Sequence, residues 1–127
     1  YMRQNMKTIL ITDDKQEVRE LVEVTFRGNY EIIQAESGSM AVDMAKKHKP
    51  DLILMDIMMP GEFDGLEATR ILKNDSDTKD IIIVLLTAKG QQSDIESGLN
   101  CGADDYFKKP FSPLELIRKV DYLLDQS

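Results

Sequence analysis

Five side chains in this sequence could carry chemistry together, because each of them follows a stretch of strand-forming residues. Asp13 and Asp14 follow ILIT, Asp56 follows LILM, Thr87 follows IIIVLL, and Lys109 follows the short run YFK. Three carboxylates close together repel one another and are usually held ionised by a bound cation or a neighbouring lysine. Mg²⁺ suits such a group, since it takes one or two carboxylates together with phosphate oxygens. An aspartate in these surroundings can act as a nucleophile towards a phosphoryl donor and form an aspartyl phosphate.

The elements that would bring these residues together alternate between short apolar runs and amphipathic stretches. Strands are predicted at residues 7–12, 30–35, 52–55, 81–86 and 105–108, and helices at about 18–25, 38–48, 66–73, 91–100 and from 113 onward. The unbroken apolar runs at 52–55 and 81–86 are typical of parallel strands that are buried on both faces. The alternation predicts a three-layer, doubly wound α/β domain, with five parallel strands joined by right-handed crossovers and helices on both faces.

The carboxyl ends of parallel strands meet at one edge of a sheet, so this fold would gather the five side chains there. Asp56 is expected to be the exposed tip of the central strand. Ser37 is predicted to cap the second helix. The helix at 91–100 offers only Ile95 and Leu99 as an apolar pair and contains a glycine, so we expect it to be weakly packed and the most mobile helix.

Composition limits the classes of protein that this chain can be. With 127 residues and 42% hydrophobic content it predicts a single domain with its own core. The lone cysteine excludes an internal disulfide, and no long apolar span or signal sequence is found, so a reducing, cytoplasmic setting is expected. A net charge of −7 argues against nonspecific attraction to nucleic acid or to an anionic membrane and favours a cation as ligand. The only histidine, His48, is assigned no role.

Residues 1–6 show no periodicity and are expected to be disordered or an added overhang, which leaves residues 7–125 as the domain. Four motifs occur in order within that range, namely ILITDD, LILMDIMMPGEFDG, LLTAK and GADDYFKKPF. Together they resemble the receiver domain of bacterial two-component response regulators, of the chemotaxis-regulator type, over residues 7–124. The resemblance implies a flavodoxin-like sheet with strand order 2-1-3-4-5. It also implies a signalling domain that catalyses only its own phosphorylation and dephosphorylation.

The resemblance implies specific roles for the acidic residues. Asp56 would accept a phosphoryl group from a phosphohistidine on a sensor histidine kinase or on a histidine phosphotransfer protein. Asp14 would bind Mg²⁺ directly and Asp13 through water, and the backbone carbonyl of Met58 would complete the protein ligands. The kinase would dock on the first helix and on the loop after the fifth strand.

The remaining motif residues would act on the phosphorylated state by the same resemblance. Lys109 would pair with Asp56 and with the phosphoryl oxygens, and Thr87 would move to hydrogen-bond the phosphate. Tyr106 would swing inward as the aromatic switch residue, and the peptide bond before Pro110 would be cis. The switched surface would lie on the fourth helix, the fifth strand and the fifth helix. A homodimer through this surface is predicted, with its candidate cross-pairs formed by Asp104, Asp105, Arg118 and Lys119.

Two features depart from the commonest pattern of the family. The loop GEFDG after Pro60 is one residue longer, which could reshape the rim of the site. Met58 and Lys89 stand two positions beyond Asp56 and Thr87, where family members control access of the hydrolytic water. An apolar Met58 would orient no water and a long Lys89 would screen the phosphate, which predicts a long-lived phosphorylated form. Alternatively, Met58 simply packs the loop.

Other interpretations of the same residues stay open at this point. Each polar residue has a structural alternative: Asp13, Asp14 and Thr87 could cap helices, Lys109 could be a solvated loop residue, and Tyr106 a half-buried aromatic. A non-phosphorylated interaction module of the same fold is the main alternative function. A haloacid-dehalogenase-type phosphatase needs an acid where Met58 stands. A flavodoxin-like FMN carrier needs a hydroxyl-rich loop where this chain has TDDKQ, whose acids repel phosphate.

Overall fold

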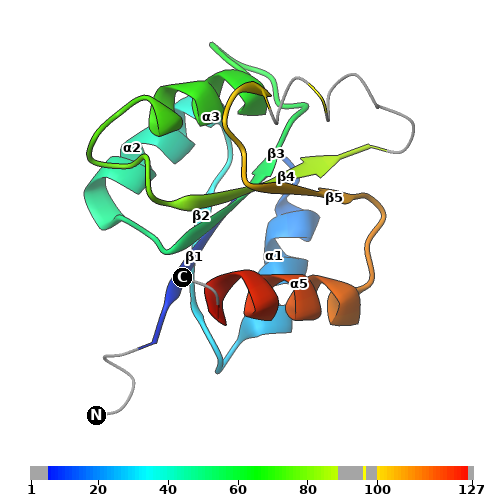
Figure 1. Cartoon of the computed structure of the whole chain (residues 1–127). Coiled ribbons are helices and arrows are strands. Elements are labelled where there is room, and N and C mark those ends of the chain that lie inside the picture. Colours follow the sequence, from blue (N-terminus) through cyan, green and yellow to red (C-terminus); the bar gives the residue numbers. More distant parts are fainter. Residues whose placement is uncertain (1–5, 89–95, 97–99, 126–127) are drawn as a thin grey trace.

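The computed structural model describes residues 6–88, 96 and 100–125 (Figure 1). In this part of the chain five parallel strands form one sheet in the order β2-β1-β3-β4-β5. The elements in chain order are β1 (Thr8–Thr12), α1 (Gln16–Phe26), β2 (Glu31–Ala35), α2 (Gly38–His48), β3 (Leu52–Asp56), α3 (Gly65–Lys73), β4 (Ile82–Thr87), β5 (Asp105–Lys108) and α5 (Pro113–Asp125). The predicted doubly wound α/β fold and its strand order are therefore confirmed.

Helices cover both faces of the sheet, with α2 and α3 on one side and α1 and α5 on the other (Figure 1). Side chains along each strand alternate between the two sides. In β3, Ile53 and Met55 join the core under α2 and α3, whereas Leu52 and Leu54 join the core under α1 and α5. All five residues of β3 are buried, because the strand is central and is covered on both faces. The central strand thus holds its carboxyl end rigidly.

Most predicted elements are present, with small shifts at their ends. Strand β1 starts at Thr8 rather than residue 7, β2 at Glu31 rather than residue 30, and β4 runs one residue later than predicted and ends on Thr87. Ser37 caps α2 as predicted, because its hydroxyl accepts the Met40 N–H. The helix expected at 91–100 falls mainly outside the described residues, as do residues 1–5. None of the helices in the described part of the chain combines the length and apolar character needed to cross a membrane.

The loop between β3 and α3 is fixed by a close backbone approach. Asp64 caps α3 by accepting the Glu67 N–H, and Gly65 donates its N–H to the Ile57 carbonyl. A Cβ on Gly65 would lie 2.1 Å from the Asp56 carbonyl oxygen, a separation that atoms cannot adopt. Only glycine can therefore start α3 directly against the end of β3. This contact determines the path of the longer loop that carries Met58.

Candidate functional site

The carboxyl edge of the sheet brings together the side chains that the sequence analysis singled out. Asp13 follows β1, Asp56 ends β3, and Lys109 follows β5. Oxygen atoms of Asp13, Asp14 and Asp56 all lie within 4.8 Å of one another. The Lys109 ammonium is 2.8 Å from Asp13 Oδ2 and 3.2 Å from Asp56 Oδ1. One lysine therefore contacts two of the three clustered carboxylates.

Asp13 and Asp14 are adjacent in the chain but differ in environment. Asp13 is fully buried, and its carboxylate accepts hydrogen bonds from the Lys15 N–H and from Lys109. Its backbone N–H donates to the Ala35 carbonyl. Asp14 is exposed, and its carboxylate forms no hydrogen bond or ion pair with any other described residue. Asp13 is thus held in place on several sides, while Asp14 keeps its oxygens free for a ligand.

Asp56 is buried, with 4% of its surface exposed, so the expectation of an exposed strand tip is wrong. The sequence places Asp56 at the end of a strand, but neighbouring loops and the Asp13 and Lys109 side chains cover it. Burial, and after it the negative charge of Asp13, raise its pKa from 3.8 to about 6. The positive charge of Lys109 opposes this rise without cancelling it. The cluster therefore carries more negative charge than its single lysine can balance.

Lys109 is half-buried, and two effects act on its ammonium group. Burial by itself lowers its pKa, but the hydrogen bond that it donates to Asp13 and the charges of Asp56 and Asp13 outweigh burial, so the pKa is raised. Lys109 is accordingly a permanent cation in the site. The Lys109–Pro110 peptide bond is cis.

Thr87 is buried at the end of β4, and its hydroxyl has no hydrogen-bond partner among the described residues. A buried polar group without a partner is rare and needs an explanation, such as a ligand that completes it. Tyr106 lies on β5, partly buried, and packs against the core under α2 and α3. The side chain of Met58 is 59% exposed, whereas Lys89 lies outside the described residues.

The donor set fits a magnesium ion. Mg²⁺ prefers carboxylate and carbonyl oxygens and keeps several waters, which matches three clustered carboxylates with one of them exposed. Soft ligands do not take part, since the cluster contains neither histidine nor cysteine. A divalent cation would also relieve the repulsion from Asp13 that, after burial, raises the pKa of Asp56.

Comparison with known proteins agrees with this arrangement. The family model described as "Response regulator receiver domain" matches residues 9–121. This chain belongs to that family. Receiver domains are signalling modules of two-component systems, in which response regulators receive phosphate from sensor kinases. Members of the family bind Mg²⁺ at an acidic pocket, and Asp13, Asp14 and Asp56 form the acidic cluster here.

Two curated relatives illustrate the similarity. The chain is 46% identical over 119 residues to the phosphate regulon transcriptional regulatory protein PhoB of Pseudomonas aeruginosa, which covers 93% of this chain and 52% of that protein. It is 40% identical over 121 residues to the transcriptional regulatory protein ResD of Bacillus subtilis, which covers 94% of this chain and 49% of that protein. The chain thus spans about half the length of the curated relatives it matches.

Solved structures show the same fold. A response regulator from Chloroflexus aurantiacus, called putative, superposes with a TM-score of 0.89 at 37% identity, covering 95% of this chain and 99% of the other. The chemotaxis response regulator CheY4 of Vibrio cholerae superposes with a TM-score of 0.86 at 28% identity, covering 93% and 98%. The receiver fold therefore extends over nearly the whole chain.

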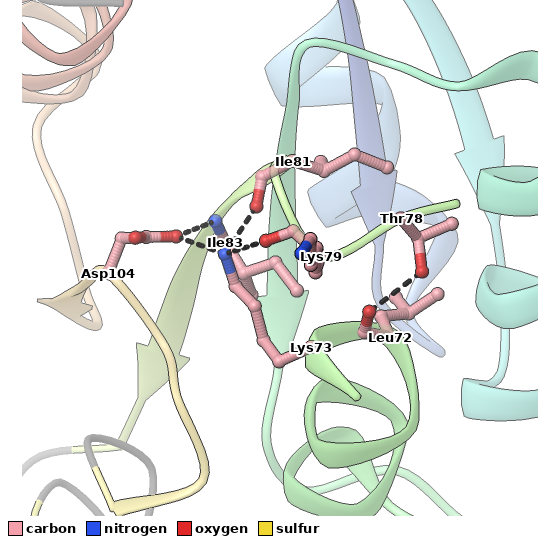
Figure 2. A network of polar contacts seen from close by, with 7 residues as sticks. All are labelled: Leu72, Lys73, Thr78, Lys79, Ile81, Ile83 and Asp104. Carbon is pink, nitrogen blue, oxygen red and sulfur yellow. Dashed lines mark hydrogen bonds and ion pairs between the residues drawn. The ribbon is translucent and has the colours of Figure 1, made fainter. Parts of the chain in front are cut away.

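The four candidates for cross-pairs in a dimer are mostly paired within the chain. Asp104 forms an ion pair with Lys73, and Asp105 forms one with Lys119. Figure 2 shows one oxygen of the Asp104 carboxylate in contact with both the Lys73 ammonium and the Ile83 N–H. Arg118 is exposed. Sequence reasoning missed Lys73, because nothing in its local context marks a lysine at the end of a helix as anything but solvated.

Proposed function

We propose that this domain accepts a phosphoryl group on Asp56 from a phosphohistidine of a sensor histidine kinase or of a histidine phosphotransfer protein. One observation carries the proposal: Asp56 is buried beside Asp13 and Lys109, in a cluster whose carboxylates outnumber its one ammonium group. Such a cluster is poor as a structural ion pair, but it suits the binding of a cation and a phosphoryl group.

The chemistry is a transfer between two nucleophiles. An Asp56 carboxylate oxygen attacks the phosphorus, an O–P bond forms, and the P–N bond to the donor imidazole breaks in line with the attack. The electron pair of that bond stays on the imidazole nitrogen. The Lys109 ammonium already lies 3.2 Å from Asp56 Oδ1. After transfer it would form an ion pair with the negatively charged phosphoryl oxygens. Because Lys109 stays protonated, it balances that charge without giving up a proton.

The metal would be held by Asp14 and Asp56 directly, by Asp13 through water, and by the Met58 backbone carbonyl. The hydrogen bonds of Asp13 to Lys15 and Lys109 support the indirect role, since both of its oxygens already have donors. When bound, Mg²⁺ would neutralise the equatorial phosphoryl oxygens during transfer. Asp14 supports a direct role through its free and exposed carboxylate.

The orphan hydroxyl of Thr87 supports its role as the group that senses the phosphate. A phosphoryl oxygen on Asp56 would give this hydroxyl the partner that it lacks among the described residues. Movement of Thr87 would vacate space for Tyr106, which lies one strand away and is only partly buried. The switched surface would then comprise the segment at 91–100, β5 and α5.

The donor would dock beside the site, on α1 and the loop after β5. A hollow of about 430 Å³ lies there, and the Lys109 that pairs with Asp56 also lines it. Leu21, which the helical pattern would place inside, is 42% exposed at this hollow. Its apolar lining consists of Val18, Leu21, Ala88, Pro110 and Phe111. A helix with an apolar stripe would fit this surface.

The phosphorylated form is proposed to be long-lived. The exposed thioether of Met58 cannot orient an attacking water as a polar side chain would. The long side chain of Lys89 would also shield the phosphoryl group from water. Met58→Asn should then speed the loss of phosphate severalfold. An unchanged rate of decay, followed by intact-protein mass, would show that Met58 only packs the loop.

A homodimer through the segment at 91–100, β5 and α5 is the proposed output. Arg118 is exposed and could form an ion pair across the dimer directly. Asp104 and Asp105 would first have to break their ion pairs with Lys73 and Lys119 within the chain. The dimer is tested by gel filtration at high concentration with and without phosphorylation. Identical elution as monomers would reject it.

The central experiment measures intact-protein mass after incubation with acetyl phosphate, with and without Mg²⁺. Wild type should gain one phosphoryl group only with Mg²⁺, and Asp56→Asn should gain none. Asp77→Asn makes the same carboxylate-to-amide change at an exposed position outside the site and should behave as wild type. If wild type gains nothing, the domain is an interaction module without phosphorylation.

A further inference from the structure

Arg19 contacts the acidic turn from the neighbouring helix. Its Nη1 donates to the Asp13 backbone carbonyl at 2.8 Å, and its Nε donates to Gln34 Oε1 at 3.1 Å. Gln34, on β2, donates in turn to Glu23 on α1. The guanidinium is thus held between α1, β2 and the end of β1. Nothing in the proposed phosphoryl transfer uses this network.

The carbonyl that Arg19 holds belongs to the peptide unit joining Asp13 to Asp14. A peptide unit is planar, so fixing its carbonyl also fixes the direction in which the chain enters Asp14. The Asp14 carboxylate itself has no contact with another described residue that could place it. Its position therefore depends on the backbone. The Lys15 N–H, which donates to Asp13 Oδ1, holds the turn from one side, and Arg19 is the described side chain that donates to the peptide carbonyl itself.

We infer that Arg19, oriented by Gln34, is a positioning residue that sets the affinity of the site for Mg²⁺ through Asp14. The inference rests on the proposed metal role of Asp14. Outer partners that orient metal ligands typically change metal affinity by 10- to 100-fold when they are removed.

Simple electrostatics predicts the opposite sign. Arg19 is a cation near a cation site, so its removal should tighten Mg²⁺ binding if charge were its only effect. Replacing Gln34 with leucine changes no charge but removes the acceptor that orients the guanidinium. The two substitutions together therefore separate positioning from charge.

The test measures binding of Mg²⁺ directly by titration calorimetry, and of Mn²⁺ by electron paramagnetic resonance. Arg19→Met should weaken Mg²⁺ binding about 10-fold, and Gln34→Leu about threefold, since the guanidinium keeps its bond to Asp13. Arg27→Met is the matched control. It makes the same charge change at the residue that follows α1, where Arg27 is exposed and its side chain forms only a loose pair with Glu23, and it should bind as wild type.

Phosphorylation by acetyl phosphate at varied Mg²⁺ supplies a second measurement. Arg19→Met should need about 10-fold more Mg²⁺ for half its maximal rate, yet reach a maximal rate within about twofold of wild type. Damage to the fold would lower the maximum instead, and thermal unfolding of each variant checks for it. Arg19→Lys, which keeps the positive charge but replaces the two separate N–H donors of the guanidinium with one ammonium group, should fall in between.

Equal or tighter binding of Mg²⁺ by Arg19→Met, or a loss shared with Arg27→Met, would overturn the inference while leaving the proposed function intact. If Arg19→Met does not fold, Gln34→Leu decides alone, and unchanged binding overturns the inference. If wild type binds no Mg²⁺, both the inference and the proposed metal role fail.

Discussion

Two lysine–carboxylate clusters lie at opposite ends of β4 and behave differently. At the start of the strand, Lys73 donates to Asp104 and to the backbone carbonyls of Ile81 and Lys79, at 2.8, 2.6 and 3.1 Å (Figure 2). An ammonium group has three N–H donors, so each finds an acceptor. Asp104 also accepts the Ile83 N–H. This cluster is balanced in charge and complete in hydrogen bonds.

The cluster at the carboxyl end is neither balanced nor complete. Lys109 contacts two carboxylates in a cluster of three, and the hydroxyl of Thr87 lacks a partner among the described residues. Burial, together with the negative charge of Asp13, raises the pKa of Asp56 there. The comparison indicates that a polar cluster in which charges and hydrogen bonds are all paired stabilises the folded state. A cluster with excess negative charge and an unpaired hydroxyl is available to bind a ligand. Four predictions test this distinction.

The largest expected effect is on the rate of phosphorylation, which should depend on Lys109 and not on Lys73. Lys109→Met should slow phosphorylation by acetyl phosphate about 100-fold, because the transfer loses the cation that balances the phosphoryl charge. Lys73→Met should change the rate by less than about twofold, since its cluster lies at the far end of β4. Time courses of intact-protein mass measure both. Similar losses in the two variants would contradict the distinction.

The second prediction is that Lys73, which should matter little for phosphorylation, matters for the stability of the fold. Lys73→Met should lower the free energy of unfolding by about 2 kcal/mol, because it removes the positive partner of Asp104 and the ammonium donor of two backbone carbonyls. Urea denaturation measures the change. Lys79→Met is the control, because Lys79 is exposed and contributes only its carbonyl, and it should stay within about 0.5 kcal/mol of wild type.

The third prediction concerns pH. The pKa of Asp56 is about 6 in the folded chain against 3.8 ordinarily, so Asp56 favours folding below about pH 4, and this contribution is lost as pH rises through 6. Without Mg²⁺, Asp56→Asn should therefore be more stable than wild type by about 2 kcal/mol at pH 7.5, with little difference near pH 4. Urea titrations at several pH values test this. A constant difference would show that the charge of Asp56 is not the cause.

Saturating Mg²⁺ sharpens the same test. By the proposed metal role, the ion would bind wild type through its carboxylates and should stabilise it more than the variant. The advantage of Asp56→Asn should then shrink or reverse at pH 7.5. Calcium-free and magnesium-free buffers serve as the reference condition.

The smallest effect compares two buried hydroxyls. Thr12 and Thr87 both lack a hydrogen-bond partner among the described residues, so replacing either with valine should raise the free energy of unfolding by up to about 1 kcal/mol. Only Thr87→Val should also alter the phosphorylated state, for instance by weakening dimerisation on gel filtration. A destabilised Thr12→Val would indicate that water satisfies this hydroxyl.

Much of the architecture was predictable from the sequence, because it depends on local pattern. Unbroken apolar runs such as residues 52–55 indicate strands covered on both faces, and their alternation with helices implies parallel order. The edge at which Asp13, Asp56 and Lys109 meet follows from that order alone. The motifs then added the strand order by resemblance, and the structure confirmed it.

Only the tertiary structure decided how much each charge is buried and which partner it has. Asp56 was expected to be exposed, yet it is buried and its pKa is raised, because burial depends on loops and side chains brought from other strands. The contacts of Lys73 with Asp104 and of Arg19 with Asp13 join separate elements of the fold. Local sequence determines what a segment forms, whereas desolvation and hydrogen-bond partners are properties of the assembled chain.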